Sequence, residues 1–157
     1  MQPCVQDGLA TLSVCKPCVR KVARAGDIVV AYQSPPGCAK LRKQPSVVFA
    51  GIVDAVVPMR LYMGSAARRD SNLYTASGAR SGPTTAYDAQ HWNWNGLSEG
   101  AVLRRDWSGK NVLLFREFYH TQRAPAQPAW MAAVVAEPAF KAGDRGRRGY
   151  RVSQLAV

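Results

Sequence analysis

The chain has 157 residues, 47% of them hydrophobic and 20% charged, a balance typical of one folded domain spanning 1–157. No apolar run reaches the ~20 residues of a membrane span, and Met1-Gln2-Pro3-Cys4 does not resemble a signal peptide, so we expect a cytoplasmic protein with no membrane partner. Lys and Arg total 21 against 10 Asp and Glu. The resulting net charge of +11 favours nucleic acid or another polyanion as a partner, although an Arg excess is also typical of a GC-rich genome.

The N-terminal half predicts a short helix followed by a β-hairpin. Residues 8–14 suggest a short strand, and residues 17–26 suggest a helix that begins at a proline and ends at a glycine. Two β-rich runs follow, 28–32 and 46–57, joined by a turn-rich basic segment. Such an arrangement favours an antiparallel hairpin. Gly51, inside the second run, indicates a bulge or a close backbone approach.

The C-terminal half is less regular. Residues 58–63 suggest one helical turn, and residues 64–109 look like a long loop rich in Gly, Ser, Asn and Arg. A strand is predicted over 111–115 and another over 150–157, while 129–136 fits either a short helix or a buried strand. Together these elements predict a small, β-rich α+β domain.

Cys15-Lys16-Pro17-Cys18 places two cysteines before a helix. A redox pair has this spacing because a helix N-terminus lowers the pKa of a thiol. A zinc site would need two further ligands, and no other Cys or His has ligand spacing. We therefore interpret the pair as ordinary thiols and predict no metal and no cofactor.

Basic residues gather at two places and predict contacts with phosphates. The predicted helix carries the first group, and its alternative interpretation is a solvated helix face. The second lies in the tail, where a solvated end is the alternative. The predicted nucleic-acid-binding residues are Lys16, Arg20, Lys21, Arg24, Arg145, Arg147 and Arg148.

The stretch from Arg20 to Val57 resembles the opening of PUA-like domains, notably their EVE and ASCH branches. The resemblance rests on a basic helix, the pair Gly26-Asp27, a strand and then Phe49-Ala50-Gly51-Ile52-Val53. It implies a PUA-like barrel with short helices that binds nucleic acid or a nucleobase. Asp27 itself is expected to close a turn.

Four segments together resemble the nucleotide modification associated domain 2 family. They are Thr11–Arg20 with Gly26-Asp27, Asp70–Tyr74, Val112–Tyr119 and Gly146–Val152, so the resemblance covers most of residues 7–152. It implies a setting in phages or mobile elements, near genes for modified DNA bases. DNA is therefore expected over RNA as the partner, with a modified nucleotide as the alternative.

His91-Trp92-Asn93-Trp94-Asn95-Gly96 is the most unusual local cluster. In an extended segment the two indoles project to one side and can stack on a base. The alternative is that they cover the core beneath a long loop. The predicted base pocket draws on Tyr32, Tyr74, Trp92, Trp94 and Tyr119.

These observations support three hypotheses. The leading one is a nucleic-acid or nucleobase binding module associated with DNA base modification. The second is an enzyme acting on a nucleotide or DNA base, with Cys15, Asp70, Asn72 and His91 as candidate catalytic residues. The third is a phage accessory protein that binds a host protein through exposed aromatic side chains.

Overall fold

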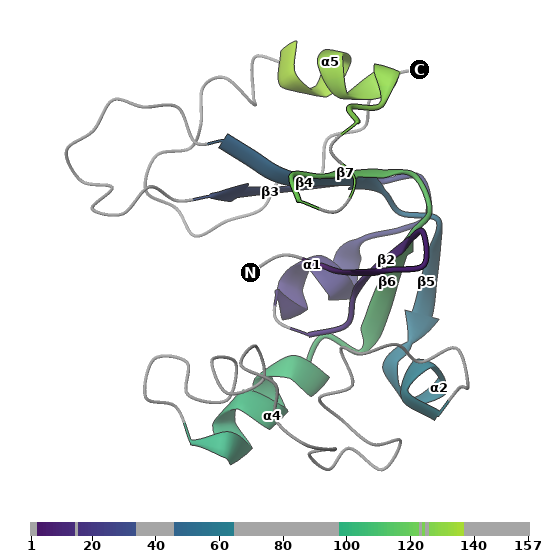
Figure 1. The fold of residues 1–157 in the computed structure, drawn as a ribbon. Coiled ribbons are helices and arrows are strands. Elements are labelled where there is room, and N and C mark those ends of the chain that lie inside the picture. The colour runs from purple at the N-terminus through teal and green to yellow at the C-terminus, as the bar shows by residue number, and fades with distance from the viewer. Residues whose placement is uncertain are drawn as a thin grey trace, which may run out of the picture.

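The structure is a computed structural model that describes residues 3–14, 16–33, 46–64, 98–122, 124 and 126–136. Within these residues the chain is α+β, with two antiparallel sheets and short helices (Figure 1). The four-stranded sheet has the order β1 (Cys4–Gln6), β2 (Leu9–Leu12), β6 (Asn111–Phe115), β5 (Ala55–Pro58). The three-stranded sheet has the order β3 (Ile28–Gln33), β4 (Ser46–Ile52), β7 (Phe118–His120). The helices are α1 (Pro17–Val22), α2 (Met59–Gly64), α4 (Glu99–Trp107) and α5 (Ala129–Ala136).

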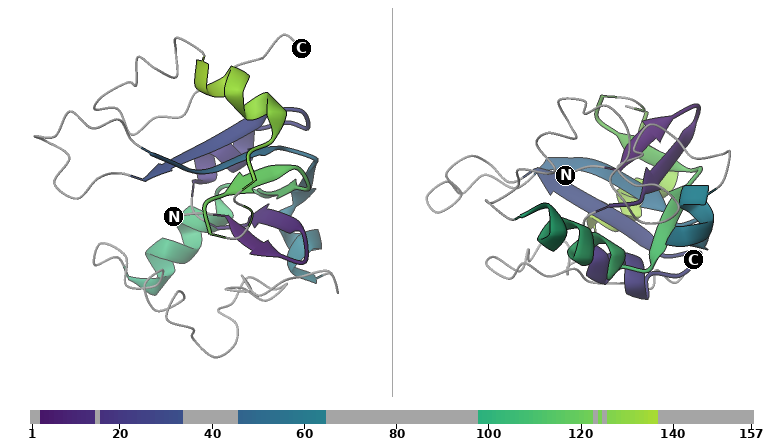
Figure 2. Two further views of the ribbon diagram at one scale, coloured as in Figure 1. Left: turned by 45° about the horizontal axis from the view of Figure 1, so that its top comes forward. Right: turned by 90° about the horizontal axis from the view of Figure 1, so that it is seen from below.

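Side chains of β6 alternate between two hydrophobic clusters. Leu113 and Phe115 join the cluster that also holds Phe49 of β4, so this cluster lies between the two sheets. Val112 joins the cluster formed with α2 and α4, which includes Met59. Alternation along a strand sends successive side chains to opposite faces, so one sheet supports both clusters. Helix α5 lies on the three-stranded sheet, away from the four-stranded one (Figures 1 and 2). No helix among the described residues is long and apolar enough to cross a membrane.

The predicted strand 46–57 is divided between the two sheets. β4 ends at Ile52 in one sheet and β5 begins at Ala55 in the other. At the corner the Val53 amide donates to the Asp27 carbonyl (2.8 Å), and the Asp54 amide donates to the Leu114 carbonyl (2.8 Å). The prediction of a single strand over 46–57 is therefore wrong. The Val-rich composition gives no sign of the break, because it continues from one sheet into the other.

The predicted hairpin of the runs 28–32 and 46–57 is confirmed as the antiparallel pair β3–β4, with Ile28 opposite Ile52. Of the two interpretations of Gly51, a bulge or a close backbone approach, the structure supports the close approach. A Cβ at Gly51 would lie 2.8 Å from Cζ of Phe49 and 2.9 Å from Cδ1 of Phe115. The irregularity in this hairpin lies instead between Ala31 and Tyr32.

Two helices refine the predictions for the C-terminal half. Helix α4 lies inside the segment 64–109 that the sequence predicts to be a loop, and that prediction is wrong for Glu99–Trp107. The Ser98 hydroxyl accepts from the Ala101 amide (3.4 Å), an N-cap, and Val102 is fully buried on the inner face. The segment 129–136, left open between helix and strand, is the helix α5.

The chain passes between the sheets twice at one place. The β4–β5 and β6–β7 connections form adjacent corners, joined by a hydrogen bond from the Ile52 amide to the Glu117 carbonyl (3.1 Å). Arg116 and Asp54 also form an exposed ion pair there (3.1 Å). The described strands thus make two open sheets joined at a corner, and the PUA-like barrel is not confirmed.

Candidate nucleic-acid interface

Helix α1 is short, and three of the predicted cations in it or next to it are exposed to solvent. Lys16 precedes it in the left-handed conformation (φ 43°), and Pro17 occupies its first turn, where no amide hydrogen is needed. The side chains of Lys16, Lys21 and Arg24 are exposed. These three positions agree with an outward-facing basic surface.

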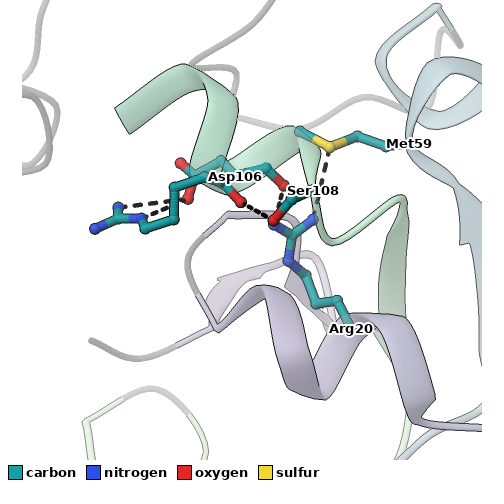
Figure 3. Close-up of polar contacts among 5 residues, drawn as sticks. Arg20, Met59, Asp106 and Ser108 are labelled. Atoms are coloured by element: carbon teal, nitrogen blue, oxygen red, sulfur yellow. Dashed lines mark hydrogen bonds and ion pairs between the residues drawn. The ribbon is translucent and has the colours of Figure 1, made fainter. Parts of the chain in front are cut away.

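Arg20 does not belong to that surface. Its exposed fraction is 0%, and its guanidinium points from α1 toward the C-terminal end of α4 (Figure 3). Nη2 donates to the carbonyl of Asp106, and Nη1 lies 3.6 Å from the sulfur of Met59. The predicted phosphate contact by Arg20 is therefore wrong, because this guanidinium is buried and already binds groups of the protein.

Asn111 and Gly109 position the Arg20 side chain. Its Nη1 donates to the Asn111 carbonyl (2.8 Å), while Asn111 Nδ2 donates to the Arg20 carbonyl (3.1 Å). Gly109 leaves room for the guanidinium, since a Cβ there would lie 2.6 Å from Cζ of Arg20. A fork with several donors suits two carbonyls at once, which a lysine cannot match.

The predicted turn at Asp27 is confirmed. Its Oδ2 accepts from the Arg24 amide (2.7 Å), and its own amide donates to the Arg24 carbonyl (3.1 Å). Gly26 takes φ 90° in this turn, and its amide donates to the Val53 carbonyl (2.8 Å). Arg24 therefore lies close to the corner between the sheets, apart from Lys16.

Of the predicted base pocket, two members fall within the described backbone. Tyr119 is half-buried on β7 and pairs with Ala50, whereas Tyr32 on β3 pairs with Val47. Because β4 lies between their strands and their partners are three residues apart along it, the two tyrosines are not neighbours. The structure therefore does not bring this pair together.

The remaining candidates lie outside the described residues. They comprise the other pocket members, the catalytic candidates and the basic tail: Tyr74, Trp92, Trp94, Cys15, Asp70, Asn72, His91, Arg145, Arg147 and Arg148. Cys18 is exposed with a free thiol. In the part of the chain that is described, no three His, Cys, Asp or Glu side chains form a metal-binding group.

Three exposed cations outside the predicted set lie in or next to the helices. They are Arg60 in the first turn of α2, Arg104 in the last turn of α4, and Lys110 just before β6. The Met59 amide donates to the Lys110 carbonyl (2.8 Å), so α2 begins next to Lys110. The antiparallel pairing of β5 with β6 brings α2 beside Lys110 and the end of α4, and a local sequence pattern contains no such signal.

Comparison with known proteins supplies the family. The model of nucleotide modification associated domain 2 matches residues 1–145, which is most of the chain. No curated protein and no solved structure matches. The resemblance found in the sequence is thereby confirmed, and the chain belongs to the nucleotide modification associated domain 2 family.

Proposed function

We propose that this protein is a nucleic-acid-binding module that acts together with nucleotide or DNA-base modification. The observation that carries the proposal is the exposure of Lys16 and Lys21 beside α1, in a chain with a net charge of +11. Exposed ammonium groups neutralise phosphates and release counterions, a sequence-independent source of affinity for nucleic acid. The link to nucleotide modification comes from the family to which the chain belongs.

The proposal includes a site for one base. Tyr119, half-buried on β7, offers a ring at the three-stranded sheet, and base–aromatic stacking contributes about 1–3 kcal/mol per base. DNA is the proposed nucleic acid, and the proposed setting is the cytoplasm of a host that carries a phage or mobile element. Further rings and tail cations that the proposal assigns to this site and to phosphates are Tyr74, Trp92, Trp94, Arg145, Arg147 and Arg148.

Fluorescence anisotropy on the full chain tests the proposal. Labelled single-stranded and duplex DNA, each plain and base-modified, are titrated with protein at salt concentrations from about 50 to 200 mM. We expect binding at low salt, with an affinity that falls linearly on logarithmic axes as salt rises. Tighter binding of one base-modified strand would identify the base. No binding at low salt, or an affinity independent of salt, would refute the proposal.

A further inference from the structure

The two ends of the four-stranded sheet differ in their surroundings. At one end β5 finishes at Pro58, opposite Asn111 at the start of β6, and α2 and α4 adjoin it; this is the helix end (Figure 1). At the other end Ala55 pairs with Leu114 and Ala10 with Phe115, next to the two corners and the β1–β2 turn; this is the corner end.

The helix end carries exposed cations. Arg60, Arg104 and Lys110 come from three different segments and lie beside the start of β6. Lys16 joins them, because it precedes α1 and follows Val14, which packs with the α2 and α4 side chains. Among the side chains described at this end, the acidic one is Asp106, and it is fully buried.

Exposed acids gather at the corner end instead. Asp7 lies in the β1–β2 turn, and Asp54 and Glu117 lie at the two corners, all with exposed side chains. The exposed cation at the corners, Arg116, forms an ion pair with Asp54. Positive charge at this end is thus offset by carboxylates, whereas the described surface of the helix end is purely basic.

Hydrogen bonds fix the backbone that carries two of the helix-end cations, Arg104 and Lys110. The last four carbonyls of a helix lack partners within it, but in α4 each has one. Amides of Ser108, Gly109 and Lys110 bond the carbonyls of Arg104, Asp106 and Trp107, and the Ser108 hydroxyl bonds that of Arg105. Arg20 adds a second donor to Asp106 and binds Asn111. The backbone at Arg104 and Lys110 is therefore held in place.

We propose that the helix end, with Lys16, Arg60, Arg104 and Lys110, is the surface on which the phosphate backbone of DNA lies. This inference rests on the proposed function and adds where the DNA binds and how it is oriented. Cations without a carboxylate partner among the described residues create an attractive potential for phosphates, and carboxylates at the opposite end repel them. The corner end should therefore face away from the DNA.

Two variants of the full chain, matched in net charge, test this placement. Arg60→Gln with Arg104→Gln removes two exposed guanidinium groups from the helix end. Arg116→Glu makes the same change of two units in net charge at the corners, where Arg116 is exposed. Both change the net charge equally, so a difference between them reports position. Affinity for a plain 16-base-pair duplex is measured by anisotropy over the same salt series, and circular dichroism checks the fold of each variant.

For the helix-end variant we expect the magnitude of the salt slope to fall by about 1.8, because each phosphate contact contributes about 0.9. Its affinity at 50 mM salt should fall about tenfold or more, against a change of less than about threefold for the corner variant. Equal losses in the two variants, or a larger loss at the corners, would overturn the placement while leaving the proposed function standing. Absence of salt-dependent binding by the unmodified chain would instead refute the proposed function itself.

Discussion

Arg20 and Asn111 exchange hydrogen bonds in both directions across 91 positions of the sequence. The Arg20 guanidinium donates to the Asn111 carbonyl, and the Asn111 amide group donates to the Arg20 carbonyl. The same guanidinium binds the Asp106 carbonyl at the end of α4. One buried side chain therefore joins α1, α4 and β6, and it supports the surface that carries the neighbouring exposed cations.

The first prediction concerns the fork geometry of Arg20. Arg20→Lys keeps the charge but replaces the two donor nitrogens by one, so it cannot keep both hydrogen bonds in their present geometry. The free energy of unfolding should therefore fall by about 2–4 kcal/mol. Arg24→Lys makes the same change at an exposed position and should stay within about 0.5 kcal/mol of the parent. Urea denaturation followed by circular dichroism measures both. Equal stability of the two variants would show that the buried contacts contribute nothing.

A second prediction uses the space that Gly109 leaves. In Gly109→Ala the new methyl group would lie 2.6 Å from Cζ of Arg20 and must displace the guanidinium. We expect a loss of about 1–3 kcal/mol in unfolding free energy. Gly100→Ala is the control, because its position on α4 is exposed and its Cβ meets its nearest atom at 3.5 Å. That variant should gain about 0.5–1 kcal/mol.

The loss of unfolding free energy in Gly109→Ala should also depend on the presence of Arg20. Replacing Arg20 by Met removes the guanidinium, so Gly109→Ala should cost less than about 0.5 kcal/mol in that background. A thermodynamic cycle of the two single variants and the double variant, measured by urea denaturation, gives the coupling. Additive losses would mean that the methyl group at residue 109 disturbs something other than Arg20.

Much of the fold follows from local pattern, but the role of Arg20 does not. Helical spacing of Val19, Val22 and Ala23 predicts a helix here, but α1 ends at Val22 and not at Gly26, and Val22 is exposed. The same spacing places Arg20 on the solvated face, where it does not lie. Two carbonyls from distant segments determine its position instead. A six-residue helix is covered on more than one side by its neighbours, so the amphipathic pattern is a poor guide to exposure here.

The candidate site depends even more on tertiary structure. Lys16 and Lys21 were identified from a run of basic residues, and both are exposed. Arg60, Arg104 and Lys110 are scattered in the sequence and meet only through the pairing of β5 with β6 and the docking of α4. Helix α4 itself was missed because its single N-cap, Ser98, follows a long polar segment without hydrophobic periodicity.

The third prediction concerns the aromatic cluster between the sheets. Phe49 lies edge-on to Phe115 (5.2 Å between ring centroids) and is stacked with Phe118 (6.1 Å). A Cβ added at Gly51 would lie under 3 Å from the rings of Phe49 and Phe115, so Gly51→Ala must push at least one ring aside. We expect a loss of about 1–3 kcal/mol in unfolding free energy. Calorimetry should show a lower melting temperature, and an unchanged one would show that the rings move without cost.

The last prediction has the opposite sign and concerns Thr11 on β2. Its side chain is only 1% exposed, and its hydroxyl has no hydrogen-bond partner among the described residues. Thr11→Val keeps the shape and removes a buried polar group, so the free energy of unfolding should rise by about 1 kcal/mol. Thr11→Ser keeps the hydroxyl but loses a methyl group, and it should lower stability by about 1 kcal/mol. Urea denaturation compares the two, and a Val variant less stable than the parent would mean that the hydroxyl is bonded in solution.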